Sequence, residues 1–163
     1  MPGLFEFYAK VRETDVGLQE IKNIIKKLNK QEILVGIPQE KSGRKGQGAS
    51  NAELLYIHTN GSPINNIPAR PVIEPSIEDS KEEIALLFKG AAEQALNRNL
   101  QGSLAQLDKA GLQGENAAKG WFTNPKNNWA VNSQTTIDRK GSDRPLIDTG
   151  EMRKSITHVM REK

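Results

Sequence analysis

Four prolines between residues 63 and 75 impose the strongest local constraint on this chain. Proline fixes φ, lacks an amide hydrogen and pushes the preceding residue out of the helical region, so this segment cannot continue a helix. We therefore expect residues 62–76 to be stiff and extended. Arg70 lies between Ala69 and Pro71 in this segment. An arginine held in this way suits bidentate pairing with a carboxylate, either within the chain or in a neighbouring subunit.

The residues before the prolines predict strand, helix, strand and a short helix. Residues 4–12 alternate apolar and polar side chains with the period of a half-buried strand. Apolar residues then recur at three- and four-residue steps over residues 15–28, which predicts an amphipathic helix. Residues 32–37 form a short, branched apolar run and predict a buried strand that pairs with the first. Residues 51–59 predict the short helix.

Two long helical regions follow the prolines. The first begins at residue 76 or 79 and reaches about residue 99. The second covers residues 103–124, where Gly111 and Gly114 interrupt the pattern, so we expect two helices with a kink.

Polar sequence dominates the remainder. Residues 123–148 have little periodicity and predict a long extended loop. One helical turn at residues 151–152 and a final strand over residues 155–161 complete the chain. The predicted fold class is α+β: a small antiparallel β-sheet flanked by helices, with long Pro-rich and charged loops, in a single domain spanning residues 1–163.

Composition excludes several classes of chemistry. The absence of cysteine removes disulfides, thiol nucleophiles and thiolate metal sites, and only two histidines are present. No catalytic constellation, metal site or cofactor motif is visible, so we expect a protein that is not an enzyme and has no cofactor. The net charge of +3 is too small to imply nucleic-acid binding by itself. No stretch approaches the roughly 18 apolar residues of a membrane span, so no membrane association is expected.

A basic segment over residues 39–50 predicts a flexible loop, because it has three glycines and no large apolar side chain. It lacks the Gly-Lys-Ser/Thr ending of a phosphate-binding loop. Its three cations, Lys41, Arg44 and Lys45, are candidates for contact with DNA or with an acidic partner.

The densest charge pattern lies in residues 139–154, where acidic and basic residues alternate. The plain interpretation is a solvated loop that leads into a strand. However, Pro145, Leu146 and Ile147 form a small apolar plug between the charges, a composition that favours docking onto another surface. The candidate interface residues are Arg70, Arg139, Lys140, Arg144, Leu146, Ile147 and Arg153.

The order of these motifs resembles a known family. The strings YIHTNGSP and IPARPVIEP, two helical regions and the late string RPLIDTGEMRKSI are similar to those of the virion-morphogenesis or tail-completion proteins of long-tailed bacteriophages. Those proteins carry Pro-Ala-Arg-Pro, matched by residues 68–71, and a late Pro-Leu-x-Asp-Thr-Gly, matched by residues 145–150. The resemblance covers residues 50–160.

The resemblance implies a structural protein without a cofactor, located in the virion neck or tail after assembly in the host cytoplasm. It implies a homo-oligomeric ring of roughly six or twelve copies that joins the head connector to the tail. Its partners would be portal or connector proteins, tail terminator or tube proteins, and the genomic DNA in the lumen. The rival classes are a DNA-binding accessory protein that uses residues 39–50 and a small hydrolase. If residues 145–147 dock on a partner, replacing Leu146 and Ile147 by Asp should leave the monomer folded but abolish ring assembly or head-tail joining.

Overall fold

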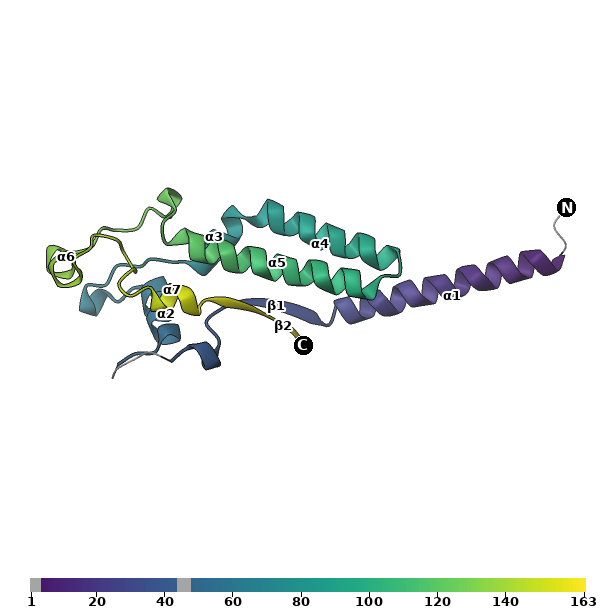
Figure 1. The fold of residues 1–163 in the computed structure, drawn as a ribbon, viewed down its shortest axis with the longest axis horizontal. Coiled ribbons are helices and arrows are strands. Elements are labelled where there is room, and N and C mark those ends of the chain that lie inside the picture. Colours follow the sequence, from purple (N-terminus) through teal and green to yellow (C-terminus); the bar gives the residue numbers. More distant parts are fainter. Residues whose placement is uncertain (1–3, 44–47) are drawn as a thin grey trace.

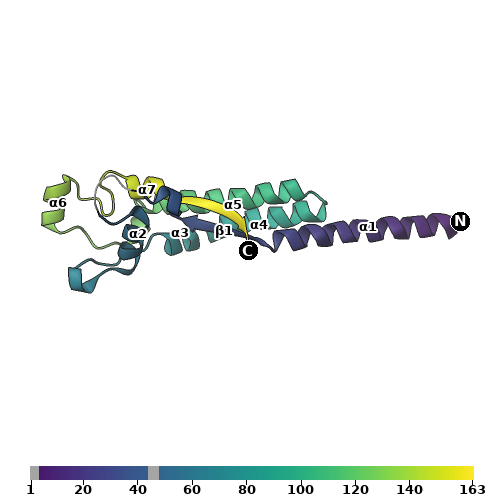
Figure 2. The same ribbon diagram turned by 90° about the horizontal axis from the view of Figure 1, so that it is seen from below.

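The computed structural model describes residues 4–43 and 48–163, with side chains from residue 15 onward. The molecule is elongated (Figures 1 and 2). Helix α1 (Leu4–Leu28) projects from one end, a small sheet and a helical hairpin form the middle, and irregular segments with short helices form the other end. Seven helices and one two-stranded sheet are described, which confirms the predicted α+β class.

The sheet brings the segment after α1 beside the last strand of the chain. Strand β1 (Gln31–Gly36) pairs antiparallel with β2 (Thr157–Glu162), and Leu34 lies opposite Val159. Both strands lie close to their predicted ranges, so the predictions over residues 32–37 and 155–161 are confirmed. A two-stranded sheet has marginal stability alone. Here it is supported on one face by helix α5 (Leu100–Trp121), which packs on both strands.

Helix α4 (Lys81–Leu96) packs on α5 as an antiparallel hairpin. The Ser103 hydroxyl ties the pair together by donating to the carbonyl of Ala91 at 2.9 Å. The expected long helix over residues 76–99 is divided at Ser80, because the separate helix α3 (Ile73–Asp79) precedes α4. Helix α3 also packs on α5.

The predicted kink at Gly111 and Gly114 is wrong, because α5 is continuous through both residues. A Cβ atom at Gly111 would lie 2.5 Å from His158 Cδ2, and one at Gly114 would lie 2.9 Å from Ile77 Cδ1. Glycine inside a helix costs about 1 kcal/mol relative to alanine. At these positions the cost is offset by close approach of α5 to its neighbours.

The core lies where α5 meets the C-terminal segments. Val72, Ala118 and Ile156 are completely buried, and Trp121 and Phe122 pack with them. Smaller contributions come from α2 (Asn51–Asn60) and α7 (Glu151–Ser155), which contact each other. Helix α2 begins with a capping box, in which the Ser50 hydroxyl accepts from the amide of Glu53 and the Glu53 carboxylate accepts from the amide of Ser50.

The predicted strand over residues 4–12 is wrong, because these residues belong to α1. Alternation over nine residues does not exclude a helix, and Leu4, Phe7 and Val11 also share one helical stripe. The helix predicted over residues 15–28 is therefore present but begins eleven residues earlier. The partner expected for β1 is also wrong, since β1 pairs with β2.

Two segments expected to be extended contain short helices. Residues 62–76 include a 3-10 turn at Pro63–Asn65 and the start of α3, in which Pro75 occupies the tolerated first turn. Residues 123–148 include a 3-10 turn at Pro125–Asn127 and helix α6 (Gln134–Lys140). The Ser133 hydroxyl accepts from the Thr136 amide at the start of α6, and Gly141 ends the helix at φ 65°.

Residues 44–47 of the predicted flexible loop lie outside the described residues, and Gln39–Lys41 form a 3-10 turn. Among the described helices, none combines the length and the apolar character needed to cross a membrane.

Candidate functional site

Arg70 fixes the arrangement of the Pro-rich segment. Its side chain is buried, and its Nε and Nη2 atoms donate to the carbonyl of Ala130 at 3.1 and 2.9 Å. Nη2 also donates to the carbonyl of Val131 at 3.2 Å and to Asn132 Oδ1 at 3.4 Å. Two nitrogens of Arg70 bind one oxygen of the same chain, so a carboxylate partner within the chain is wrong. A carboxylate partner in a neighbouring subunit stays a prediction. Burial lowers the pKa of Arg70.

Asn132 extends this connection into the charged segment. Its Nδ2 atom donates to the carbonyl of Asp143 at 3.0 Å. Nearby, Lys140 Nζ donates to the carbonyl of Arg144 at 2.7 Å, across the turn that ends α6. Hydrogen bonds therefore run from the Pro-rich segment at residue 70 to the 139–148 segment, although more than sixty residues separate them in sequence.

The apolar plug packs against the protein's own core. Leu146 and Ile147 are partly buried and contact the cluster formed by Val72, Trp121 and Ile156. Leu146 also has a φ of 57°, a left-handed conformation that is uncommon outside glycine. Replacing either side chain by Asp would therefore place a charge against the core. The expectation that such a double variant leaves the monomer folded does not fit this packing.

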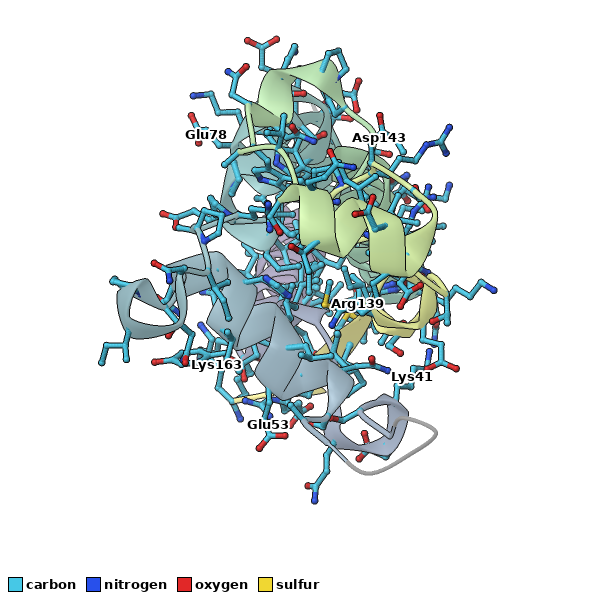
Figure 3. All side chains as sticks on the ribbon, turned by 90° about the vertical axis from the view of Figure 1, so that its left-hand side faces the viewer. Lys41, Glu53, Glu78, Arg139, Asp143 and Lys163 are labelled. Atoms are coloured by element: carbon cyan, nitrogen blue, oxygen red, sulfur yellow. The ribbon has the colours of Figure 1, made fainter. Side chains whose placement is uncertain are left out.

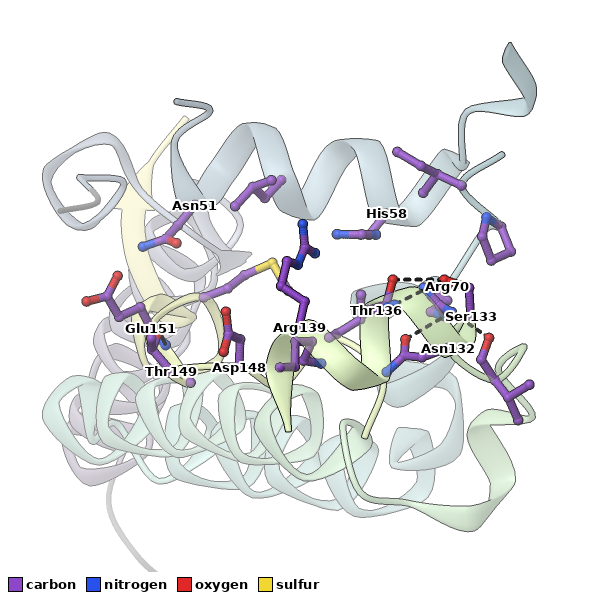
Figure 4. A pocket seen from close by; sticks show the side chains of 18 of the residues that line it. Asn51, His58, Arg70, Asn132, Ser133, Thr136, Arg139, Asp148, Thr149 and Glu151 are labelled. Atoms are coloured by element: carbon purple, nitrogen blue, oxygen red, sulfur yellow. Dashed lines mark hydrogen bonds between the residues drawn. The ribbon is translucent and has the colours of Figure 1, made fainter. Parts of the chain in front are cut away.

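The segments that carry the family-like motifs enclose one cavity of about 630 Å³ (Figure 4). One wall is α2, a second is the Pro-rich segment, and the remaining walls are α6 with its preceding loop and the 146–152 segment. The lining residues are Asn51, Leu54, His58, Asn66, Ile67, Pro68, Arg70, Val131, Asn132, Ser133, Thr136, Arg139, Lys140, Leu146, Asp148, Thr149, Gly150, Glu151 and Met152.

Side chains of both charges line this cavity. Figure 4 shows Arg139 between α2 and the part of the wall that carries Asp148 and Glu151. Lys140 also lines the cavity, and desolvation lowers its pKa while the negative charge of Asp148 raises it. Leu54 and Met152 add apolar surface. This lining suits a peptide that combines apolar and charged side chains.

His58 contributes an unpaired polar atom to the cavity region. Its Nδ1 atom is buried and has no hydrogen-bond partner among the described residues. Desolvation lowers the pKa of His58, and the positive charges of Arg70 and Lys140 lower it further. Both effects favour the neutral imidazole, which has one donor and one acceptor nitrogen. The part of the chain that the structure describes contains no group of three metal-ligating side chains.

Two of the most exposed large apolar side chains lie at the same end of the molecule as the cavity. Val131 lines the cavity and is 84% exposed, while Ile64, in the turn beside the Pro-rich wall, is 95% exposed. Figure 3 views this end directly, with Arg139 near its centre. Exposed apolar side chains around a partly charged hollow are typical of a protein interaction surface.

The candidate residues from the sequence separate into two groups. Arg139, Lys140, Arg70 and Leu146 line the cavity, whereas Arg144 lies outside it. Arg153 is directed inward, because its Nε atom donates to the carbonyl of Lys119 at 2.7 Å near the end of α5.

Of the three basic residues proposed to contact DNA, Lys41 is exposed in its 3-10 turn. Arg44 and Lys45 lie outside the described residues.

The α2 wall of the cavity was not predicted. Asn51 is almost completely buried there, and its Nδ2 atom donates to the Ser155 hydroxyl at 3.0 Å and to the carbonyl of Gly43 at 3.2 Å. An asparagine directly after a helix N-cap serine gives no sequence signal for such a role. Its contacts are non-local, so only the folded chain reveals them.

His158 meets two carboxylates away from the cavity. Its Nδ1 atom lies 2.8 Å from Glu115 Oε2, and its Nε2 atom lies 3.3 Å from Asp108 Oδ1. The same Glu115 oxygen accepts from the His158 amide and the Thr157 hydroxyl, so this group joins β2 to α5. His158 does not line the main cavity. The expectation that the chain is not an enzyme stays a prediction.

Comparisons with protein-family models, with curated proteins and with solved structures find no match for this chain. The function is therefore inferred from the motif segments and from the cavity that they enclose.

Proposed function

We propose that this chain is a structural subunit of the neck of a tailed-phage virion, where copies form a ring that joins the head connector to the tail around the DNA channel. One observation carries the proposal. The Pro-Ala-Arg-Pro segment and the Pro-Leu-x-Asp-Thr-Gly segment, which resemble those of tail-completion proteins, form two walls of the same cavity. The two segments that support the resemblance thus meet in a single surface feature.

The cavity is held in shape before any partner arrives. The Arg70 and Asn132 hydrogen bonds connect its walls, and Leu146 anchors one wall to the core. A preformed surface loses less conformational entropy on binding, which favours repeated assembly of identical subunits. Arg139 and Asp148 present opposite charges that can fix the register of a bound segment.

A ring requires two different patches on every subunit, because each copy contacts one neighbour through one patch and the next neighbour through the other. In this proposal the cavity with its exposed Ile64 and Val131 is the first patch, and it accepts an apolar and charged segment of an adjoining copy or of an adjoining neck layer.

Complementation of a phage that lacks this chain tests the proposal. Without the chain, we expect lysates that contain DNA-filled heads and separate tails, and the wild-type chain should restore joined particles. The variant Ile64→Asp/Val131→Asp changes two exposed side chains and should fold but fail to restore joining. Ala105→Asp, on the exposed face of α5, is the control and should restore it.

Intact infectious particles formed without the chain would overturn the neck function. Full rescue by Ile64→Asp/Val131→Asp would exclude the cavity end as the joining surface.

A further inference from the structure

Helix α1 carries an apolar stripe that its own subunit covers only in part. Leu18, Ile21, Ile25 and Leu28 follow each other at three- and four-residue steps. Leu18 is 49% and Ile25 is 41% exposed, while Ile21 and Leu28 are partly buried. In the same helical register Leu4, Phe7 and Val11 continue the stripe toward the N-terminus. Apolar residues with this spacing occupy one side of a helix and favour packing against another helix.

The subunit packs on the adjoining side of α1, to which the partly buried Ile21 and Leu28 also belong. Ile24 is buried, Glu20 Oε2 lies 3.8 Å from Arg98 Nη1, and a Cβ at Gly17 would lie 3.7 Å from the same guanidinium atom. Gly17 and Glu20 thus face Arg98, at the tip of the α4–α5 hairpin. The N-terminal part of α1 extends beyond that tip, as both views show (Figures 1 and 2). Leu18 and Ile25 of the apolar stripe therefore remain open to a partner helix.

Helix α4 carries a second exposed apolar stripe. Ala85, Phe88, Ala92 and Leu96 follow each other at steps of three, four and four residues, and all four are exposed. Leu96 is 62% exposed. The buried residues of α4, Ala91 and Ala95, belong to the side that packs on α5. Two alanines in the exposed stripe leave room for another helix to approach closely.

We propose that the apolar stripe of α1 in one copy of this chain docks on the α4 stripe of a second copy. The dimensions match: at about 1.5 Å per residue, Leu4 to Leu18 spans roughly 21 Å and Ala85 to Leu96 roughly 17 Å. Charge is weakly complementary, since α1 has five basic and four acidic residues while α4 has two basic and three acidic ones. The contact buries two otherwise exposed apolar surfaces together.

This contact is heterologous, because the surface that each copy gives differs from the surface that it receives. Such contacts close into rings when the rotation between copies permits it. The biological role of this contact rests on the proposed neck function, in which it would be one interface between neighbouring subunits of the ring. The association itself can be measured on the purified full chain, so its failure is distinguishable from failure of the neck function.

The experiment compares the association of four forms of the full chain by sedimentation velocity from about 1 to 100 μM. The donor variant is Val11→Asp/Leu18→Asp, and the acceptor variant is Phe88→Asp/Leu96→Asp. The control is Val16→Asp/Leu86→Asp, which alters exposed apolar residues of the same two helices. Around their helices, Val16 lies roughly 160° from Leu18, and Leu86 lies roughly 160° from Phe88 and roughly 80° from Leu96.

The wild type and the control should associate with similar dissociation constants. The donor and acceptor variants should each have a dissociation constant at least tenfold higher. Mixing the two variants should give dimers and no larger species, because one intact donor and one intact acceptor remain. Far-ultraviolet circular dichroism checks folding. If Phe88→Asp/Leu96→Asp is unfolded, Leu96→Asp alone serves as the acceptor variant.

Three results would overturn the inference. The wild type could stay monomeric up to the highest concentration, or the mixture of variants could stay monomeric. Association of the acceptor variant at wild-type strength, with a monomeric donor variant, would instead indicate a coiled coil between two α1 helices.

Discussion

Replacing Glu115 by Gln should weaken the attachment of strand β2 to helix α5. One oxygen of this carboxylate accepts from the amide of His158 at 3.1 Å and from the Thr157 hydroxyl at 3.2 Å, and it lies 2.8 Å from His158 Nδ1. The other oxygen accepts from Lys119 Nζ at 2.6 Å. Glutamine is almost the same size, but it carries no charge and offers a single acceptor oxygen.

The size of the effect follows from the pKa of Glu115. Desolvation raises this pKa, but the hydrogen bonds from Lys119 and His158 outweigh it and lower the pKa from 4.5 to about 2. A difference of this size between the folded and unfolded states corresponds to about 3 kcal/mol at neutral pH. The Lys119 side chain is 30% exposed, so solvent screens part of the interaction. We expect Glu115→Gln to lower the free energy of unfolding by about 2 kcal/mol at pH 7.

The pH dependence of the stability difference between the wild type and Glu115→Gln tests the same explanation. Because the folded-state pKa is lowered, the stabilisation is complete above the unfolded pKa of 4.5 and is lost as the pH falls toward about 2. Urea unfolding of both forms, followed by circular dichroism at pH 7 and at pH 3, should show a difference that shrinks by at least half at pH 3. Equal stability at pH 7, or a difference that stays constant to pH 3, would refute this account of Glu115.

Two further substitutions test the packing and the cavity walls. Gly111→Ala should lower the free energy of unfolding in urea by about 1–3 kcal/mol, because the added Cβ would meet His158. Gly120→Ala is the control, since no atom lies within 4 Å of its Cβ, and it should be neutral or stabilise by up to about 1 kcal/mol. Equal effects of the two substitutions would contradict the close approach of α5 to His158. Arg70→Lys should lower the free energy of unfolding by about 1–3 kcal/mol and speed amide hydrogen exchange at residues 130–132, because lysine cannot reproduce the two-nitrogen contact. Unchanged exchange would show that Arg70 does not hold this wall of the cavity.

The elements that the sequence predicted well are those with local signals. β1 is a branched apolar run that ends before Pro38, and α2 begins with Ser50 and Glu53 in capping-box spacing. Such features depend on neighbouring residues, so they can be recognised without the tertiary structure.

The errors arise where distant contacts decide the conformation. Residues 4–12 alternate like a strand, yet no described strand offers them a pairing partner and they extend α1. Gly111 and Gly114 resemble helix breakers, but they admit β2, β1 and α3 close to α5. Glycine has the same local propensity in both roles, so its neighbours in space determine which role it has.

In the candidate site, too, local features were predictable from the sequence and distant contacts were not. Its motif segments were singled out from sequence, but the partners of Arg70 lie sixty or more residues away and are carbonyl and amide oxygens. The apolar plug at residues 145–147 was expected to dock on a partner, whereas Leu146 and Ile147 pack on the chain's own core. Apolar residues in a loop have the same sequence signature in both cases.

A search for this chain in phage particles tests the proposed neck function most directly. If the proposal is right, cryo-electron microscopy of virions that contain the chain should show a closed ring of copies between the head connector and the tail, with the channel running through the ring. Absence of the chain from purified virions, or its location on the capsid surface or at the tail tip, would contradict the account.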